Sequence, residues 1–442
     1  MRLLGRATLV AVGALAGACG SVQNVSVDGG GDDDDIDASA DPDAAGGIDA
    51  PPPDPMWTDE IRIGHDDLAN QVSNFGTDIA VDASGNAIVV FYDQGEVWAR
   101  RYVRATDTWD PLQRISESVS TGVNPRVDVD DAGNAMVAWY SSSAQGVVYA
   151  RRFDAASGWT TGWGTVATVA GGTSGVQQYM TGLDMTSDGH AAVTFYRWNT
   201  AGGTYEVWAA VFEDGGGWTA PVRLSTAGGT GQNPAIGVAR MGTQVRVVAA
   251  WSESAAGRLD VHGSVSTYDT ATNVLTPGAQ TLLETENTRD YLSPRVMMDE
   301  AGNALVVFQQ RSSTGADYHV ISTRYAGGSW SGAMAVDTSA TDARDFAGAM
   351  NGAGMAVVVW RNCNANVCSL WGRRNNGGNW LQGQQISEEI ATSSPSVAVD
   401  GAGRALALWR QDVAAVSSIL ASELDPQSGW SAAHTLEVDN TN

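Results

Sequence analysis

The sequence contains no lysine, so all 25 of its basic residues are arginine, and they face 50 acidic residues. The absence of lysine excludes Schiff-base and other side-chain amine chemistry. The net charge of −25 argues against nucleic acid as a partner, because recognition of phosphates needs a basic face. No segment has helical periodicity, and no apolar run reaches the ~20 residues that a membrane span requires.

Histidine and cysteine are also scarce. The five histidines are scattered along the chain, and the three cysteines contain one close pair, so no metal site is predicted. The motifs HExxH and GxSxG and a P-loop are absent, and no paired-histidine signal occurs. The sequence therefore predicts neither a cofactor nor catalytic residues.

One pattern recurs along the chain. A short β-branched run ends in Asp, Asn or Thr, a Gly follows three residues later, and an aromatic residue follows nine residues after the same anchor. Six copies keep this spacing and end at Phe91, Trp139, Phe195, Phe308, Trp360 and Trp409. A seventh copy, from Ala239 to Trp251, is three residues longer. A repeat of ~50 residues built only from strand-like segments is typical of a β-propeller blade.

Each repeat contains four strand-like segments. The anchor, such as Asp130, is expected to cap a turn through its side chain, and the Gly three residues later is expected to adopt a positive φ. The strand after this turn is apolar on both faces, as expected for a strand between two neighbouring sheets. A third strand and a Gly-rich turn leading to a Trp then precede the fourth strand. We therefore predict an all-β fold, a seven-bladed β-propeller of four-stranded antiparallel blades, over residues 56–442.

The repeats leave one fourth-strand segment too many. Trp57–Ile63 resembles such a strand, and so does the segment around Trp430 in the last repeat. Propellers can close their ring by pairing a strand from one terminus into a blade of the other, which removes an open edge. We favour Trp57–Ile63 as the closing strand of the last blade, and the segment around Trp430 is the alternative.

The N-terminal 55 residues have a different composition. Residues 1–18 carry Arg2 and Arg6 before a short apolar stretch, which is typical of a signal peptide. The following Cys19 comes directly after two small residues and resembles the lipid-modified cysteine of bacterial lipoproteins; ordinary cleavage after Ala18 is the alternative. Residues 19–55 are rich in Asp and predict an acidic disordered linker behind the lipidated Cys19. The protein is thus expected in the bacterial cell envelope, as an outer membrane lipoprotein held by its lipid anchor.

Cys363 and Cys368 flank a four-residue segment between two strands of the sixth repeat. In an exported protein this spacing predicts a disulfide that clamps a hairpin.

A candidate ligand site follows from charged and aromatic residues near one end of the expected channel. The innermost strands carry charged residues at positions that alternate with the apolar ones. In the second strands, a polar or aromatic residue comes shortly after the aromatic residue that ends each copy of the repeat pattern. The predicted ligand-binding residues are Asp78, Tyr92, Arg126, Tyr140, Arg197, Glu253, Arg295, Arg361 and Arg410, and Tyr196 belongs to the same ring. Their composition suits a sugar or a peptide. The alternative is a structural network of Arg–Asp pairs that fills the channel.

The repeats resemble those of bacterial propeller lipoproteins and, more loosely, NHL-type and sialidase-type (BNR-like) repeats. The resemblance depends on the patterns P-x-V-x-V-D-x-x-G-N-A and G-W and covers nearly all of residues 57–442. The Ser-x-Asp-x-Gly-x-Thr-Trp box of sialidases is absent. We therefore expect a monomeric, non-catalytic binding or scaffold module for an extracytoplasmic glycan or protein. A glycan-active enzyme, sialidase-like or another glycoside hydrolase, is the alternative.

Overall fold

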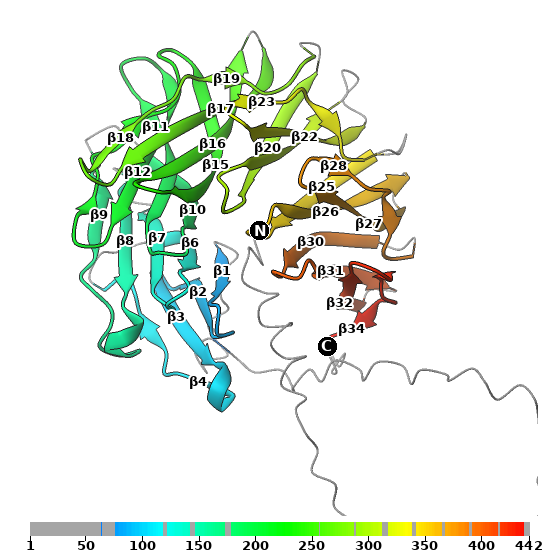
Figure 1. Ribbon diagram of the computed structural model, residues 1–442, viewed down its shortest axis with the longest axis horizontal. Coiled ribbons are helices and arrows are strands. Elements are labelled where there is room, and N and C mark those ends of the chain that lie inside the picture. Colours follow the sequence, from blue (N-terminus) through cyan, green and yellow to red (C-terminus); the bar gives the residue numbers. More distant parts are fainter. Residues whose placement is uncertain are drawn as a thin grey trace, which may run out of the picture.

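The computed structural model describes residue 63 and residues 76–117, 122–141, 146–172, 178–255, 257–286, 289–311, 317–337, 342–364, 367–388, 391–413 and 416–436. In this part of the chain the strands form seven separate antiparallel sheets, and each sheet comes from one continuous stretch of sequence. We number these blades 1 to 7 in chain order. Figure 1 shows the blades arranged around a common axis, with the first strand of each blade innermost. The predicted seven-bladed β-propeller is confirmed.

The first three blades lie between residues 77 and 223. Blade 1 contains β1 (Thr77–Val81), β2 (Ala87–Asp93), β3 (Glu96–Val103), β4 (Thr108–Trp109) and β5 (Gln113–Arg114). Blade 2 contains β6 (Gly122–Val129), β7 (Ala135–Ser141), β8 (Val148–Phe153) and β9 (Ala167–Ala170). Blade 3 contains β10 (Gln178–Met185), β11 (Ala191–Asn199), β12 (Thr204–Glu213), β13 (Gly217–Trp218) and β14 (Val222–Arg223). Two short 3-10 turns, η1 (Arg104–Thr106) and η2 (Ala155–Ser157), follow the third strands of blades 1 and 2.

The other four blades repeat this order. Blade 4 contains β15 (Thr230–Met241), β16 (Gln244–Ala255), β17 (Arg258–Asp269), β18 (Val274–Thr276) and β19 (Thr281–Leu282). Blade 5 contains β20 (Asp290–Met298), β21 (Ala304–Arg311), β22 (Tyr318–Ala326), β23 (Ser329–Trp330) and β24 (Met334–Ala335). Blade 6 contains β25 (Asp342–Met350), β26 (Met355–Asn364), β27 (Val367–Asn376), β28 (Asn379–Trp380) and β29 (Gln384–Gln385). Blade 7 contains β30 (Ala391–Val399), β31 (Ala405–Val413), β32 (Val416–Asp425), β33 (Gly429–Trp430) and β34 (His434–Thr435).

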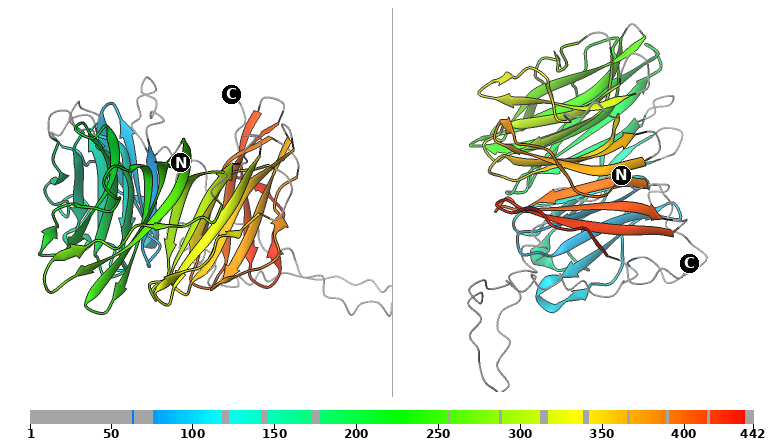
Figure 2. Two further views of the ribbon diagram at one scale, coloured as in Figure 1. Left: turned by 90° about the horizontal axis from the view of Figure 1, so that it is seen from above. Right: turned by 90° about the vertical axis from the view of Figure 1, so that its right-hand side faces the viewer.

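The fourth strand is broken in two in six of the blades, where two short pieces pair with the same third strand. In blade 2 the first piece is reduced to a single bridge between Phe153 and Trp163. Figure 2 shows the strands crossing the thickness of the disc, so that connections gather on two opposite faces. We use the name loop face for the face that carries the connections between second and third strands and those between successive blades.

The turn between the first two strands forms as the sequence predicts. In blade 2 the carboxylate of Asp130 accepts hydrogen bonds from the Ala132 N–H (2.9 Å), the Asn134 N–H (2.8 Å) and the Asn134 side-chain amide (2.8 Å). Gly133 has a φ of 82°, which a residue with a Cβ adopts only with strain. The role of the Asp anchors as turn caps is therefore confirmed at Asp130, and Asp82 makes the same set of bonds.

The core is divided among the spaces between blades. Each of the hydrophobic clusters joins two neighbouring blades; one contains Ala80 and Val90 of blade 1 together with Val137 and Trp139 of blade 2. Trp139 is fully buried, and the second-strand tryptophans of blades 4, 6 and 7 are at most 2% exposed. Apolar residues on both faces of the second strand are therefore explained, because each face packs on a different neighbour.

The innermost strands contain a bulge that the sequence pattern did not predict. In blades 2 to 7 the pairing of the first strand with the second shifts by at least one residue near its beginning. Non-glycine residues with positive φ lie at the bulge in five of these blades: Asn124 (54°), Asn233 (50°), Ser293 (53°), Asp345 (40°) and Ser394 (51°). Four of them precede a proline. The bulge bends the strand and changes which side chains reach the loop face.

The outermost strand of the last blade is not the segment that we favoured from the sequence. Blade 7 takes its fourth strand from β33 and β34, next to Trp430, so the alternative segment occupies that position. Of the segment Trp57–Ile63, only Ile63 lies within the described residues, and it is in no strand. Ile79 of blade 1 packs against Ala398 and Leu406 of blade 7, so side-chain packing joins the first and last blades.

The predicted disulfide between Cys363 and Cys368 is confirmed, and it links directly opposed residues of β26 and β27. Within the described residues no helix is long and apolar enough to cross a membrane. The predicted signal peptide (1–18) and the lipidated linker (19–55) lie outside the described residues.

Candidate functional site

The nine predicted ligand-binding residues are distributed over all seven blades. Several of them have partners inside their own blade. Glu253 is 6% exposed and accepts hydrogen bonds from the Trp251 indole N–H (3.0 Å) and the Gln280 amide (3.1 Å). Arg410 forms an ion pair with Asp412 at 2.9 Å. These contacts hold both side chains in place, and their part in binding stays a prediction.

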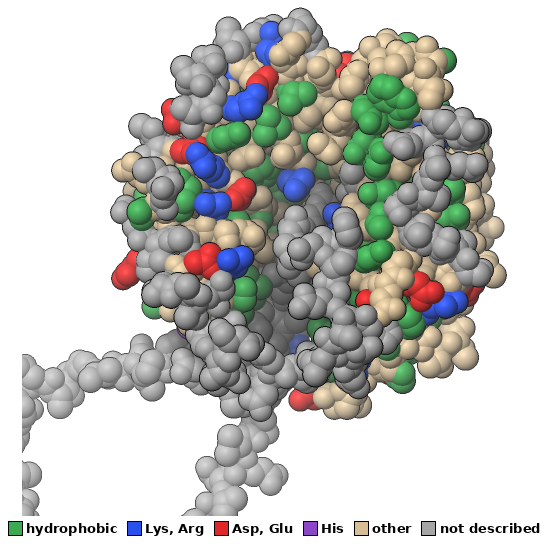
Figure 3. All heavy atoms as spheres, turned by 180° about the vertical axis from the view of Figure 1, so that it is seen from behind, with side chains coloured by type: hydrophobic (Ala, Val, Ile, Leu, Met, Phe, Trp, Pro, Cys, Tyr) green, Lys and Arg blue, Asp and Glu red, His purple; other side chains and the backbone are tan. Residues whose placement is uncertain are grey.

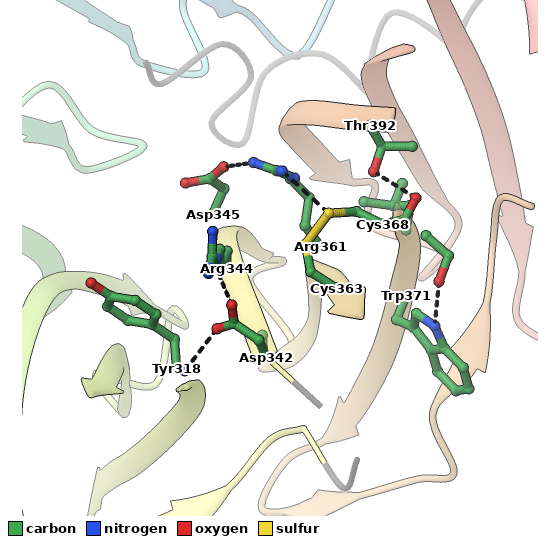
Figure 4. The surroundings of a disulfide bond; sticks show 12 residues. Tyr318, Asp342, Arg344, Asp345, Arg361, Cys363, Cys368, Trp371 and Thr392 are labelled. Atoms are coloured by element: carbon green, nitrogen blue, oxygen red, sulfur yellow. Dashed lines mark hydrogen bonds and ion pairs between the residues drawn. A yellow bond between two sulfur atoms is a disulfide. The ribbon is translucent and has the colours of Figure 1, made fainter. Parts of the chain in front are cut away.

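Arg361 lies beside the disulfide of blade 6. Its guanidinium forms an ion pair with Asp345 and donates to the Cys368 sulfur at 3.3 Å. Figure 4 shows Arg361 between the carboxylate and the disulfide, with Arg344 paired to Asp342 next to it. Arg361 thus connects the bulge of the first strand to the hairpin that the disulfide clamps.

The inner-strand aspartates link neighbouring blades. The Val127 N–H donates to Asp78 Oδ2 (3.2 Å), which joins blade 2 to blade 1. Asp128 accepts from the Met185 N–H of blade 3 (2.8 Å) in the same way. Asp184 of blade 3 accepts from Val238 of blade 4 (2.6 Å). Three successive blade boundaries therefore carry a charge-assisted bond from a carboxylate to a backbone N–H, which is a structural role for these charges.

Three further predicted residues remain, and two of them form local hydrogen bonds. Tyr92 is half-buried near the end of β2. Arg295 donates through Nη1 to the Pro294 carbonyl oxygen (3.2 Å), and Arg126 makes the same bond to Pro125 (3.1 Å). Both arginines directly follow the proline of the bulge.

Three of the predicted residues, Arg126, Tyr140 and Arg197, face the space between blades 2 and 3. Near them the structure adds aromatic residues that the sequence pattern did not identify. Tyr140, at the end of β7, contacts Tyr179 of β10 edge to face, with ring centroids 5.6 Å apart. Tyr179 stacks on Tyr196 of β11 (4.9 Å), and Tyr196 contacts Tyr205 of β12 (5.4 Å). Tyr205 in turn contacts Trp198 at 4.7 Å. We call these five residues the aromatic ladder.

The aromatic ladder follows from strand pairing. Tyr179 lies directly opposite Tyr196 in the pairing of β10 with β11, and Trp198 lies opposite Tyr205 in that of β11 with β12. The ladder thus runs from Tyr140 of blade 2 across the inner three strands of blade 3, on the loop face. All five side chains are half-buried, so each ring keeps part of its surface accessible.

The ladder is uncharged at neutral pH. Burial and three neighbouring tyrosines raise the pKa of Tyr196 to about 12. Burial also raises the pKa of Tyr179, and Tyr205 adds to this effect. The phenol groups therefore keep their protons and can both donate and accept hydrogen bonds.

Arg197 lies next to the ladder. Its guanidinium stacks over the ring of Trp208 at 4.4 Å from the centroid, and Nη2 donates to Gln178 Oε1 at 3.4 Å. Burial lowers the pKa of Arg197, although an arginine remains charged at neutral pH. Figure 3 shows one face of the molecule hollowed near its middle, with arginine side chains in the hollow.

Two other places in the described residues have some features of a site. A cavity of about 240 Å³ between blades 1 and 2 is lined by Asp82, Asn86 and Arg101, but it is smaller than the ~300 Å³ at which ligand pockets begin. In blade 4, Glu284 occupies the position where Ser116 and Ser225 accept a backbone N–H in other blades. Burial and the adjacent Asp260 raise the pKa of Glu284 to about 7, but Glu284 is only 4% exposed.

Comparison with known proteins finds similar solved structures but assigns no family. No protein-family model and no curated protein matches the chain. Among solved structures, a polysaccharide lyase of family PL25, an ulvan lyase, is similar with a TM-score of 0.47 at 11% identity, covering 80% of this chain and 90% of that one. The polysaccharide lyase Uly1 has a TM-score of 0.48 at 9% identity, with 78% and 88% covered. The propeller domain of the Trilobed protease from Pyrococcus furiosus has a TM-score of 0.44 at 9% identity, with 80% and 93% covered. Similarities at this level do not assign an activity to the chain.

Proposed function

We propose that this protein is a non-catalytic, carbohydrate-binding β-propeller of the bacterial cell envelope. The observation that supports this proposal most directly is the aromatic ladder, five half-buried rings in continuous contact on the loop face. A row of half-buried aromatic rings suits an elongated ligand that offers several apolar surfaces in succession.

A sugar chain has the matching chemistry. Each sugar ring presents C–H groups that pack on an aromatic face and hydroxyl groups that form hydrogen bonds at its edge. Neutral phenol groups of Tyr179 and Tyr196 can both donate to and accept from such hydroxyls. Ligand sites of this kind combine aromatic walls with few polar groups that fix the orientation.

The enzyme alternative has less support. A glycoside hydrolase needs two carboxyl groups that reach the bond to be cleaved. Among the described residues, Glu284 next to Asp260 is a carboxyl pair of this kind, because burial and Asp260 raise the pKa of Glu284 to about 7. Their exposed fractions are only 4% and 5%, so a substrate does not reach them. Binding without cleavage is the better-supported role.

In this proposal the propeller is exported and is attached through Cys19 to the outer membrane. The acidic residues between the anchor and the propeller act as a solvated spacer, since a segment with so many like charges cannot bury a core. A propeller held in this way can meet extracytoplasmic glycans as a monomer.

A glycan array tests the proposed function, with titration calorimetry on the best ligand. The wild-type protein is expected to bind oligosaccharides, and Tyr179→Ala with Tyr196→Ala is expected to weaken that binding about 30-fold or more, as for a central aromatic contact. Tyr318→Ala, a half-buried tyrosine of blade 5, is the matched control and should bind as wild type does. An array without any bound glycan, or the release of new reducing ends from a bound one, would contradict the proposal.

A further inference from the structure

Two arginines face the same space between blades 2 and 3. Arg126 lies opposite Ala138 in the pairing of β6 with β7, and therefore on the side of blade 2 that also carries Tyr140. That side packs against blade 3. Arg197 lies on the same side of β11 as Phe195, which belongs to the same cluster. The two guanidinium groups thus come from the two walls of one inter-blade space, beside the inner end of the aromatic ladder.

Neither arginine forms an ion pair with a carboxylate within the described residues. Most of the arginines in that part of the chain do so: Arg101, Arg114, Arg151, Arg152, Arg223, Arg240, Arg258, Arg289, Arg311, Arg324, Arg344, Arg361, Arg404 and Arg410. With 50 acidic residues against 25 arginines in the chain, carboxylates are plentiful. Arg126 and Arg197 are thus among the arginines that form no direct ion pair in this part of the chain, although the charge of Glu206, opposite Arg197 in the pairing of β11 with β12, partly offsets the effect of burial on the pKa of Arg197.

Both side chains are also short of hydrogen bonds. The Nε atoms of Arg126 and Arg197 are buried and have no hydrogen-bond partner in the described part of the chain. The hydrogen bonds that they do form are to neutral oxygens, the Pro125 carbonyl for Arg126 and the Gln178 amide for Arg197. A partly buried guanidinium is most stable when an anion accepts its forked N–H groups, so these two groups are suited to an anion supplied from outside.

We infer that Arg126 and Arg197 bind the carboxylate of an acidic sugar whose neighbouring sugars stack on the aromatic ladder. This inference rests on the proposed carbohydrate-binding function and specifies its ligand. The charge of Arg126 acts at the ladder itself: burial and Tyr179 raise the pKa of Tyr140, and Arg126 opposes that rise.

The ligand carries an isolated acidic sugar and is not a dense polyanion. The chain has a net charge of −25, which repels a closely charged polymer from most of the surface. Two arginines on the facing walls of one inter-blade space offset that repulsion at one place, and their guanidinium groups suit a single carboxylate.

The test uses oligosaccharide pairs that differ only at C6 of one sugar, a carboxylate in one member and a hydroxymethyl group in the other. Titration calorimetry of the full-length protein is expected to give at least tenfold tighter binding for the acidic member. The double variant Arg126→Gln with Arg197→Gln should remove this preference while the neutral member binds as before. Arg114→Gln, which removes an arginine paired with Glu96 in blade 1, is the control and should keep the preference.

The outcomes separate the two proposals. Equal binding of both members by the wild type, still weakened by Tyr196→Ala, would overturn the acidic-sugar assignment and leave carbohydrate binding in place. A preference that persists in the double arginine variant would also overturn it. Failure of every pair to bind would overturn both proposals. The comparison of the pair on the wild type requires no substitution, so it remains decisive if a variant does not fold.

Discussion

The rings of Tyr179 and Tyr196 are stacked, with centroids 4.9 Å apart and planes inclined by 22°. Tyr179 belongs to β10 and Tyr196 to β11, and the two residues are directly opposed in the antiparallel pairing. Cross-strand aromatic pairs stabilise a sheet by up to ~1 kcal/mol. Both rings are half-buried, so part of each remains accessible. This pair joins Tyr140 on one side to Tyr205 on the other, so it lies at the centre of the aromatic ladder.

The first prediction separates stacking from hydrogen bonding at this centre. Tyr196→Ala is expected to weaken oligosaccharide binding by about 2 kcal/mol, because it removes the ring, while Tyr196→Phe should bind within about threefold of wild type. Titration calorimetry measures both variants, and thermal melting checks that each is folded. Equal losses in the two variants would show that the hydroxyl group, and not the ring face, carries the interaction.

The second prediction concerns the turn cap of blade 2. Asp130→Ala should lower the free energy of unfolding by about 1–2 kcal/mol, since three hydrogen bonds to its carboxylate are lost. Urea unfolding measures this change, with the exposed neighbour Asp131→Ala as the control. Oligosaccharide binding should be unchanged in both, because the turn lies on the face opposite the ladder. A binding defect at unaltered stability would contradict the structural role of Asp130.

The third prediction is a pH dependence caused by Glu284. Burial and Asp260 raise its pKa in the folded protein to about 7, above the value of an unfolded glutamate near 4.5. The folded state therefore holds more protons than the unfolded state between these values, so its contribution to stability is full below about pH 4.5 and is lost as the pH rises through about 7.

Glu284→Gln removes this titration. At pH 8 the variant should melt a few degrees above wild type, and its melting temperature should fall less between pH 5 and 8. Glu286→Gln is the control, because Glu286 is exposed and pairs with Arg289. Parallel melting curves for wild type and Glu284→Gln across this pH range would rule out the buried titration.

The fourth prediction concerns the disulfide of blade 6. Cys363 and Cys368 enclose a very short loop, and the loop-entropy relation gives a stabilisation of about 2 kcal/mol for a loop of this size. The variant Cys363→Ser with Cys368→Ser should lose about this much in urea unfolding, and reducing agent should destabilise the wild type but not the variant. If reductant leaves the wild-type unfolding curve unchanged, the bond does not contribute to stability.

The fifth prediction concerns the anchor. Cys19→Ser should move the protein from the membrane fraction to the soluble fraction, because the acyl chains are lost. Intact mass of the membrane-associated wild type should show acyl groups on Cys19 and no residues before it. An unmodified Cys19 in a processed chain would instead indicate ordinary cleavage after Ala18.

Part of the candidate site could be predicted from the sequence. Tyr140, Arg126 and Arg197 follow from counting along the repeat, and Tyr196 occupies the position equivalent to Tyr140 in the next blade. Tyr179, Tyr205 and Trp198 were missed, since the repeat pattern has no aromatic residue at their positions. The alternating aromatics of Tyr196, Trp198 and Tyr205 in the second and third strands of blade 3 are the one local signal that could have identified them.

The sequence by itself determined the number of blades, the strands and the turns of this protein. Those features depend on contacts a few residues apart, such as Asp130 with Asn134, and on the alternation of side chains along a strand, so they are visible as spacing. Tertiary structure alone decided which side chains meet between blades. The contact of Tyr140 with Tyr179, the bond from Val127 to Asp78 and the placement of Arg126 and Arg197 on the two walls of one inter-blade space depend on how neighbouring sheets stack and on the bulge in the inner strands of blades 2 to 7. A shift of one residue in a strand reverses the direction of every side chain beyond it, and the proline that recurs at the bulge does not by itself give the size of that shift.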